Sequence, residues 1–175
     1  MLKRTLFFVL LTFDGSAYAQ LGEVNLEMTG TIVAAGCDVR IESQEQNVHI
    51  GDFPAATFTS LDSVTPFKAF NINLEKCSAG IAGAEVMFTG KSDDIKPDLL
   101  ALSDTTGTGS MASGVAVEIL NNGMKPIPIN TPSSEVYPLS EGFNTLSFLL
   151  RYRATRLPVK AGNASAIMYF DLVYQ

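Results

Sequence analysis

Two thiols are the side chains best placed for chemistry in this 175-residue chain. Cys37 and Cys77 lie forty positions apart, and the sequence has no other cysteine. In an oxidising compartment such a pair forms a disulfide, which for a loop of this length would remove roughly 3 to 4 kcal/mol of denatured-state entropy. Two separate buried thiols are the alternative. A metal site is poorly supported, because two cysteines and the lone His49 are too few and too scattered for a tetrahedral set.

The chain offers few groups for catalysis. His49 is its only imidazole, so a Ser-His-Asp or Cys-His arrangement would have to use it. It lies between Val48 and Ile50 on an expected strand, where a surface or structural histidine is the ordinary interpretation. The sequence therefore predicts a protein that is not an enzyme and that needs no cofactor.

Two short motifs match ligand sites only in part. Thr89-Gly90-Lys91-Ser92 ends like a phosphate-binding loop, but Glu85 stands where that loop needs a glycine, and no helix is expected after it. Asp93 and Asp94 are adjacent, so they point in opposite directions on an extended chain and lack the other oxygen ligands of a calcium site. The first match is therefore accidental, and the two aspartates are expected in a solvated turn.

The first nineteen residues have the parts of a secretory signal peptide. Lys3 and Arg4 supply the positive start, residues 6–12 a short apolar run, and Ala17-Tyr18-Ala19 an A-x-A cleavage site. The run is too short to span a bilayer. An N-terminal membrane anchor or a buried strand is the alternative. Export would place both cysteines in an oxidising compartment, which favours the disulfide.

Removal of the signal leaves 156 residues, the ordinary size of one domain and enough to bury a core. This part carries ten basic and seventeen acidic side chains, a formal charge of −7. That is the wrong sign for binding phosphate backbones, so nucleic acid is not an expected partner. No apolar run near twenty residues remains, so no membrane span is expected in the mature chain.

Both ends of the mature chain alternate between apolar and polar positions. Successive side chains of a strand point to opposite faces, so each apolar set lies on one face of an extended strand. A strand without a partner exposes a ladder of N–H and C=O groups that recruits another chain. We therefore expect the ends to join molecules, the alternative being a complete sandwich that uses the first segment as its own strand. The alternating positions are Val24, Leu26, Met28, Gly30 and Ile32 near the N-terminus, and Ala164, Ala166, Met168, Phe170, Leu172 and Tyr174 at the C-terminus.

Between the ends, short extended segments recur with no convincing helical window. Asn121-Asn122-Gly123 is a hairpin signal, because Asn and Gly accept positive φ, and Pro128 confines the strand after it to an edge. Ser103–Gly114 and Thr131–Gly142 are expected to be loops. Eight or nine strands at short intervals are typical of an antiparallel sandwich, so the predicted fold class is all-β. The expected strands cover residues 31–39, 47–53, 70–77, 84–90, 115–120, 126–129, 146–154 and 162–175.

In this order, these features resemble the pilin subunits of chaperone-usher fimbriae. The likeness covers the whole mature chain. It comprises an alternating N-terminal segment with Gly30, the cysteines Cys37 and Cys77, Gly162 at the start of the final strand, and a penultimate tyrosine, Tyr174. Four further segments resemble the minor tip-fibrillum adaptor subunit of type 1 fimbriae. They are residues 86–90, 99–102, 127–134 and 144–154.

The resemblance implies an incomplete immunoglobulin-like sandwich that lacks its final strand and has a hydrophobic groove in its place. A periplasmic chaperone would fill the groove first, and the N-terminal extension of the next subunit would replace it in the fibre. Residues 1–19 would be the signal peptide, 20–33 the donor-strand extension and 34–175 the pilin domain. The donor residues would be Val24, Leu26, Met28 and Ile32, with Gly30 where a side chain would not fit. The groove strand would carry Gly162, Ala164, Ala166, Met168, Phe170, Leu172 and Tyr174, with Gln175 at the end that the chaperone holds.

The resemblance also implies where the protein acts and with which partners. It predicts export through the periplasm to the cell surface and a structural role in an adhesive fimbria, as a minor tip or adaptor subunit. The expected partners are a periplasmic pilus chaperone, an outer-membrane usher and neighbouring pilus subunits, including an adhesin. A secreted immunoglobulin-like module that binds carbohydrate is the alternative, and it would use the loops Ser103–Gly114 and Thr131–Gly142.

Overall fold

The computed structural model of the chain describes residue 29 and residues 35–105, 107–133 and 135–175. The expected signal peptide and the expected donor residues, Val24, Leu26, Met28, Gly30 and Ile32, lie outside the described residues. From residue 35 onward the chain belongs to one unit. Helix in the described part is limited to one α-helical turn, α1 (Ile41–Gln44), and one 3₁₀ turn, η1 (Ala55–Thr57).

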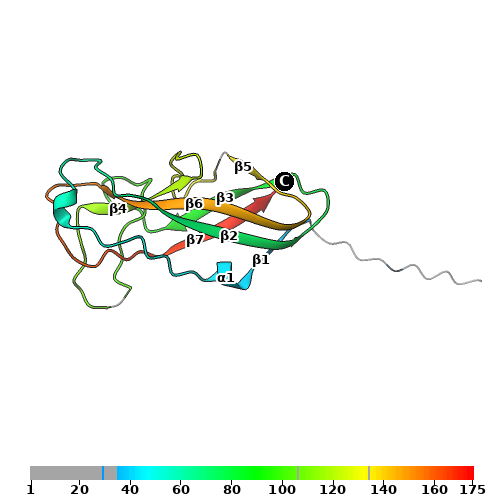
Figure 1. The fold of residues 1–175 in the computed structure, drawn as a ribbon, viewed down its shortest axis with the longest axis horizontal. Coiled ribbons are helices and arrows are strands. Elements are labelled where there is room, and N and C mark those ends of the chain that lie inside the picture. The colour runs from blue at the N-terminus through cyan, green and yellow to red at the C-terminus, as the bar shows by residue number, and fades with distance from the viewer. Residues whose placement is uncertain (1–28, 30–34, 106, 134) are drawn as a thin grey trace, which may run out of the picture. The chain divides into compact units, whose positions relative to one another are not determined.

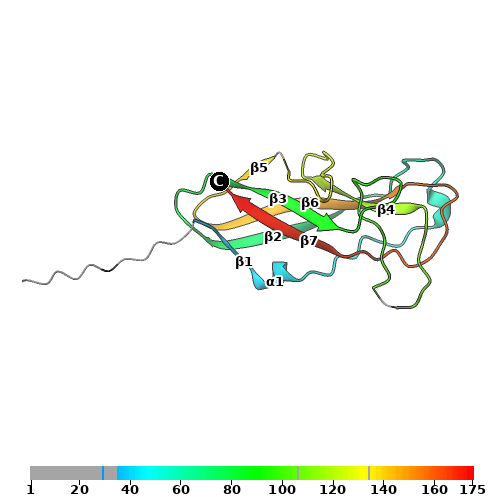
Figure 2. The ribbon, with the colours of Figure 1, turned by 180° about the vertical axis from the view of Figure 1, so that it is seen from behind.

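Two antiparallel sheets make up the described part of the unit (Figures 1 and 2). The first has the order β1-β2-β6-β4 and the second the order β5-β3-β7. The prediction of an all-β, antiparallel sandwich is confirmed. The strands are β1 (Asp38–Val39), β2 (Lys68–Cys77), β3 (Gly83–Gly90), β4 (Val115–Asn121), β5 (Val136–Pro138), β6 (Gly142–Ala154) and β7 (Met168–Tyr174).

The core lies between the sheets and is built on three phenylalanines. Phe70 of β2, Phe88 of β3 and Phe148 of β6 meet there, with the rings of Phe88 and Phe148 packed edge to face at 5.0 Å between centroids. Period-two alternation puts these residues on the inner faces of their strands, and their burial removes apolar surface from water. Each sheet therefore presents one apolar face to the other.

The edge of the first sheet at β4 is covered by other parts of the chain. Leu100 and Val117 exchange two backbone hydrogen bonds of 2.9 Å, and the N–H of Ile127 donates to the carbonyl of Ile119 at 2.9 Å. The backbone groups on this side of the strand are thus paired outside the ladder with β6. All seven residues of β4 are buried as a result.

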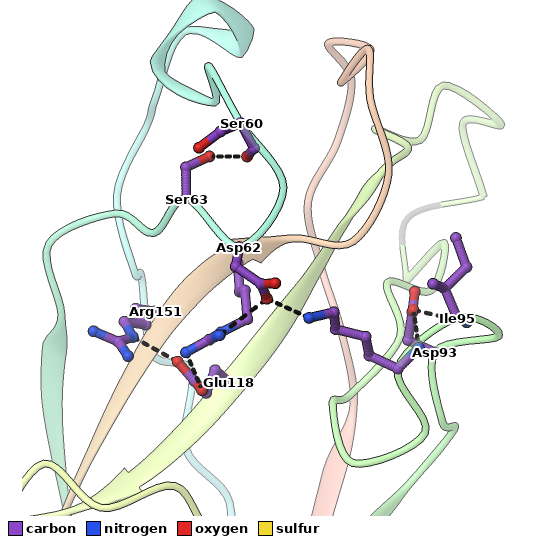
Figure 3. A network of polar contacts seen from close by, with 9 residues as sticks. Ser60, Asp62, Ser63, Asp93, Ile95, Glu118 and Arg151 are labelled. Carbon is purple, nitrogen blue, oxygen red and sulfur yellow. Dashed lines mark hydrogen bonds and ion pairs between the residues drawn. The ribbon is translucent and has the colours of Figure 1, made fainter.

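A polar network fastens the outer face of β4 to β6 and to two loops (Figure 3). The buried carboxylate of Glu118 accepts from Arg151 Nε at 2.6 Å and from Arg153 Nη2 at 2.8 Å. Asp62 accepts from Arg153 Nη1 at 3.0 Å and from Lys96 Nζ. These two hydrogen bonds hold the pKa of Asp62 below its ordinary value. A charge buried at Glu118 is tolerable because both of its oxygens are paired.

Two regions expected to be strands have no ladder. Neither residues 47–53 nor residues 126–129 are part of a strand. Residues 126–129 do return along β4 after the predicted turn, through the bridge between Leu120 and Pro126. Prolines at 126 and 128 remove N–H donors, so a regular ladder cannot form there.

Three further expectations are corrected in their bounds. The loop expected at Thr131–Gly142 contains β5, which pairs with β3. The strand expected at residues 162–175 has a ladder only from Met168 to Tyr174. Residues 41–44 form a helical turn, although no helical window was expected. In the first two cases the outcome depends on which neighbour is within hydrogen-bond reach, and a single segment's pattern does not contain that information. The helical turn is closed locally, by the N–H groups of Ser43 and Gln44 donating to the carbonyl of Arg40, and is too short to show a helical period.

The turn after β4 is a hairpin turn with an unexpected residue in the left-handed region. The N–H of Met124 donates to the carbonyl of Asn121 at 3.0 Å, which closes the turn. The positive φ, +65°, falls on Met124 and not on Gly123. The turn itself is as predicted, but the expectation that Asn and Gly would supply the positive φ is wrong.

Candidate functional site

One edge of β7 is paired along the whole strand, and the other edge has no strand partner in the described part. The strand pairs with β3 from Gly90 opposite Met168 to Ala84 opposite Tyr174, and with no other strand of the described part. Its burial alternates: Tyr169, Asp171 and Val173 are exposed, and the four residues of the other parity are only half-buried. Those four, Met168, Phe170, Leu172 and Tyr174, pack against the core and still contact solvent. The inner face of β7 is therefore not closed by the described chain.

The opposite wall is the chain that follows α1. Here the chain leaves the edge of β2, and side chains replace the ladder: Asn73 N–H donates to Ser43 Oγ at 2.9 Å, and Gln46 Nε2 donates to the carbonyl of Asn71 at 2.8 Å. Past this point Val48, Ile50 and Phe53 lie against the core, each partly buried. Residues 46–53 thus form an apolar wall without a strand partner among the described residues.

Two adjoining cavities separate this wall from the final strand. The first, of about 330 Å³, lies between Val39 and Val48 on one side and Met168 and Phe170 on the other. The second, of about 390 Å³, continues from Val48 to Phe53 opposite residues 159–165, with Tyr152 in its lining. Val48 lines both. Together they form one elongated opening into the core, which we call the slot.

One end of the slot is closed by Tyr174. Its hydroxyl donates to the carbonyl of Cys37 at 3.0 Å, and Gly36 packs against its ring. Burial raises the pKa of Tyr174. Cys37 is joined to Cys77 by a disulfide, so the predicted disulfide is confirmed. The two walls therefore meet at this end.

The other end of the slot is open, and its wall is held from outside. Tyr152 Oη donates to the carbonyl of Ala164 at 2.7 Å from the core side. On the outer side, the N–H of Ala112 donates to the carbonyl of Asn163 at 2.8 Å. A Cβ on Gly162 would lie 2.4 Å from the backbone N of Ala112, so only glycine fits there. The extended segment before β7 is thus fixed in place without a ladder on the slot side.

The expected groove residues lie along β7 and the segment that precedes it. Gly162, Ala164 and Ala166 precede β7, and Met168, Phe170, Leu172 and Tyr174 lie on its inner face. Gln175 follows, with its N–H donating to the carbonyl of Gly83 and its carbonyl accepting from the N–H of Ala82, both at 2.9 Å. The expected donor residues lie outside the described part, as stated above. Sequence reasoning missed the opposite wall, although Val48 and Ile50 share a parity that marks it.

The other candidates for chemistry are surface groups, although His49 and Asp52 lie on the slot wall. His49 and Asp52 face each other at 3.6 Å, both with exposed side chains. Asp93 Oδ1 accepts the N–H groups of Ile95 and Lys96 at 3.0 and 2.9 Å, which is the predicted turn (Figure 3). In the described ranges, no three His, Cys, Asp or Glu side chains are grouped so as to hold a metal ion. No helix of that part has the length and apolarity to cross a membrane.

Comparison with known proteins identifies what has this architecture. The family described as fimbrial protein matches residues 26–175. A fimbrial-like protein of Escherichia coli K12, YcbU, is 41% identical over 181 aligned residues and covers all of both chains. A type-1 fimbrial protein subunit of Serratia marcescens is 35% identical, covering 95% of this chain and 94% of its own. The crystal structure of the P pilus rod subunit PapA has the same fold, with a TM-score of 0.66 at 21% identity over 79% of this chain and 99% of that chain.

Proposed function

The chain belongs to the fimbrial protein family, and we infer that its slot accepts a β-strand from a neighbouring protein. As a fimbrial subunit of chaperone-usher pili it is a structural protein that polymerises with other subunits at the cell surface. The more detailed proposal concerns how one subunit is joined to the next. Each subunit would fill the slot of another with its own N-terminal extension, residues 20–33, after a periplasmic chaperone has occupied the slot and an usher has exchanged the two.

One observation carries this proposal. Two segments with strand-like patterns, residues 47–53 and 162–167, line the same slot from opposite sides, and neither has a ladder on that side. A single added strand between them would pair with both walls and cover the half-buried residues of β7. An extended peptide is the one shape that satisfies free backbone groups and an elongated apolar opening at once.

The free energy of such a join is large enough for a fibre. Four apolar plugs, Val24, Leu26, Met28 and Ile32, at roughly 1.5 to 3 kcal/mol each give about 6 to 12 kcal/mol before ordering costs. Ladder hydrogen bonds, each worth about 0.5 to 1.5 kcal/mol net, add several more. The join should therefore dissociate slowly.

The two ends of the slot suggest the direction of the added strand. Tyr174 closes one end against Cys37, so the chain that links the donor strand to its own domain has to leave at the open end. β7 runs from the open end towards Tyr174. The donor strand, whose C-terminal side leads to its domain, would then run antiparallel to β7.

The first test separates donation of the N-terminal strand from acceptance of a strand in the slot. Deletion of Gln20–Thr29 should leave folding and chaperone capture intact and stop incorporation into fibres. A synthetic peptide of residues 20–34 should bind this truncated protein and slow its unfolding, and a peptide of the same residues in scrambled order should do neither. Assembly of the truncated protein at the level of the full chain would reject the donor role.

The second test addresses the slot wall. Phe170→Glu and Tyr174→Glu should weaken chaperone capture, because each places a charge on the inner face of β7. Val173→Glu is the matched control, since Val173 lies on the outer face of the same strand, is exposed and does not line the slot. Equal co-purification with the chaperone for all three variants would reject the slot assignment.

We also propose the tip or adaptor position that the resemblance suggests, occupied by a short head-to-tail run of copies of this chain. It predicts that gold-labelled antibody against this chain marks fibre tips. Uniform labelling along the fibre shaft would assign it to the rod instead.

A further inference from the structure

A second pocket adjoins the open end of the slot. It has a volume of about 520 Å³, and the side chains that line it are apolar apart from Thr59, with polar atoms exposed among them. Ala55, Phe58 and Val159 line both this pocket and the slot, so the two are continuous. The pocket is formed by Ala55, Ala56, Phe58, Thr59, Leu157, Pro158 and Val159. Any domain whose strand fills the slot lies over this pocket when its linker is short.

The linker is short. If Ile32 is the last plug, only residues 33–35 separate it from Gly36. Gly36 is fixed to its own domain, because its carbonyl accepts the N–H of Ser78 at 3.0 Å and Cys37 is bonded to Cys77. Four Cα steps span at most about 14 Å. The end of the donor domain that carries Gly36 is therefore held against the pocket.

That end of the domain carries an exposed aromatic ring. Gly142 pairs with Cys77, and the residue after it, Phe143, is 72% exposed with the Arg40 guanidinium 5.8 Å from its ring centroid. A single exposed apolar side chain needs no explanation by itself. Phe143 differs in lying beside the point where the linker leaves the domain.

The charges without an ion-pair partner at the two ends are opposite in sign, because Arg40 beside Phe143 is itself paired with Glu42 at 2.6 Å and Glu75 at 3.9 Å. Arg156 and Lys160 flank the lining residues of the pocket, are exposed, and form no ion pair within the described chain. Asp52, the nearest acid in sequence to Ala55, faces His49. At the other end Glu141 precedes Phe143 and is also exposed and unpaired among the described residues. Opposite charges across a contact favour one orientation and repel the reverse.

We propose that the pocket at the open end of the slot receives the Phe143 end of a second copy of this chain, with Glu141 of that copy beside Arg156 and Lys160. The inference rests on the strand donation proposed above. A chain cannot make the contact with itself, because η1 and the C-terminal end of β7 lie at opposite ends of the unit (Figures 1 and 2), and Gly142 pairs with Cys77 near the latter. Each copy carries one ring and one pocket, so the contact repeats head to tail.

Disulfide trapping tests the contact directly. The two native cysteines are bonded to each other, so an introduced pair reacts without competition. The mature chain would carry Phe143→Cys together with Ala56→Cys, Thr59→Cys or Leu157→Cys in turn. After fibre assembly and mild oxidation, at least one pair should give a ladder of covalent oligomers on a non-reducing gel. Single variants should give none.

A matched control uses another exposed aromatic residue. Tyr169 is 67% exposed on the outer face of β7, so Tyr169→Cys combined with the same pocket cysteines should not cross-link. Fibres that assemble and give no ladder with any Phe143→Cys pair overturn the docking proposal and leave strand donation standing. An equal ladder with Tyr169→Cys overturns it as well.

Charge reversal provides an independent measurement. Arg156→Glu should slow assembly about tenfold at low salt, and Glu141→Lys in the same chain should restore it. Binding of the peptide of residues 20–34 should stay unchanged in all of these variants, which separates docking from slot filling. No effect of the reversal, or no rescue by Glu141→Lys, contradicts the docking. A mature chain that neither binds its peptide nor polymerises would end both proposals.

Discussion

β4 and β7 differ in burial although their positions in the fold match. Both have seven residues, and each is the last strand of its sheet in the described part. All of β4 is buried, because the Leu100 and Ile127 segments pair with its free edge. No residue of β7 is buried, since its second edge faces the slot. An edge strand is therefore completed or left unfinished by what the rest of the chain supplies, and not by its own residues.

The largest effect is expected from a substitution in the polar network of β4, the strand whose edge is covered by the rest of the chain. Glu118→Ala should lower the free energy of unfolding by about 3 to 5 kcal/mol, because Arg151 and Arg153 would keep their charges without the buried carboxylate. Chemical denaturation measures it. Asp94→Ala, at an exposed position, is the control. The loss should be the same with and without the donor peptide, and a loss that disappears when the peptide is bound would contradict the separation of the two sides.

A smaller effect is expected from a substitution in β7, the strand whose second edge faces the slot. Phe170→Ala should weaken binding of the peptide of residues 20–34 by about 10- to 100-fold, as expected for roughly 1.5 to 3 kcal/mol of lost apolar contact. Stability of the protein with an empty slot should change less, because Phe170 is only half-buried there. Titration calorimetry measures the first and denaturation the second. Val173→Ala, on the outer face of the same strand, should leave both unchanged.

The polar network beside β4 should contribute less to the stability of the protein in acid. Hydrogen bonds from Lys96 and Arg153 lower the folded pKa of Asp62 below 3.8. A lowered pKa contributes stability that is present above the unfolded value and is lost as the pH falls through the folded value. Asp62→Asn should therefore flatten the dependence of stability on pH below about 4. If the stability of this variant falls in acid as steeply as that of the unsubstituted chain, the role of the network is contradicted.

Tyr174 of β7, at the closed end of the slot, should contribute less to the stability of the protein in alkali. Burial raises the folded pKa of Tyr174 above 10. A raised pKa contributes stability that is fully present below the unfolded value and is lost as the pH rises through the folded value. Tyr174→Phe should reduce the loss of stability above pH 10. Tyr137, whose pKa burial raises to about 12, gives a comparison away from the slot, because Tyr137→Phe should remove a loss that also begins near pH 10 but continues to about pH 12.

The smallest effect concerns the hairpin turn beside β4. Met124 adopts φ +65°, a conformation that costs a non-glycine residue about 1 kcal/mol. Met124→Gly should raise the unfolding free energy by up to about that amount, and peptide binding in the slot should not change. A thermal melt with and without the peptide checks both. Destabilisation by this substitution would mean that Met124 contributes packing that its 45% exposure does not suggest.

Several elements follow from local pattern alone. The alternation from Ala164 to Tyr174 predicts which side chains of β7 face the core, because a strand has a period of two. The pairing of Cys37 with Cys77 follows from a count of two in an exported chain. The Asn121–Gly123 turn follows from turn chemistry, although its positive φ fell one residue later.

The slot itself could not be predicted as geometry from these patterns. Val48 to Phe53 alternate much as a strand does, and only the folded chain shows that Ser43 and Gln46 occupy the edge of β2 and turn that segment into a wall. β4 and β7 likewise carry similar apolar content. Which of them is covered depends on Leu100 and Ile127, residues distant from β7 and invisible to a local window.

The sequence by itself determined the fold class, the inner face of the final strand and the disulfide, because side-chain parity and thiol chemistry are local properties. Only the tertiary structure decided which edge of the sandwich is closed and which is left open. The reason is physical: a backbone ladder needs a second strand at about 4.8 Å, and whether one is present depends on the path of the entire chain.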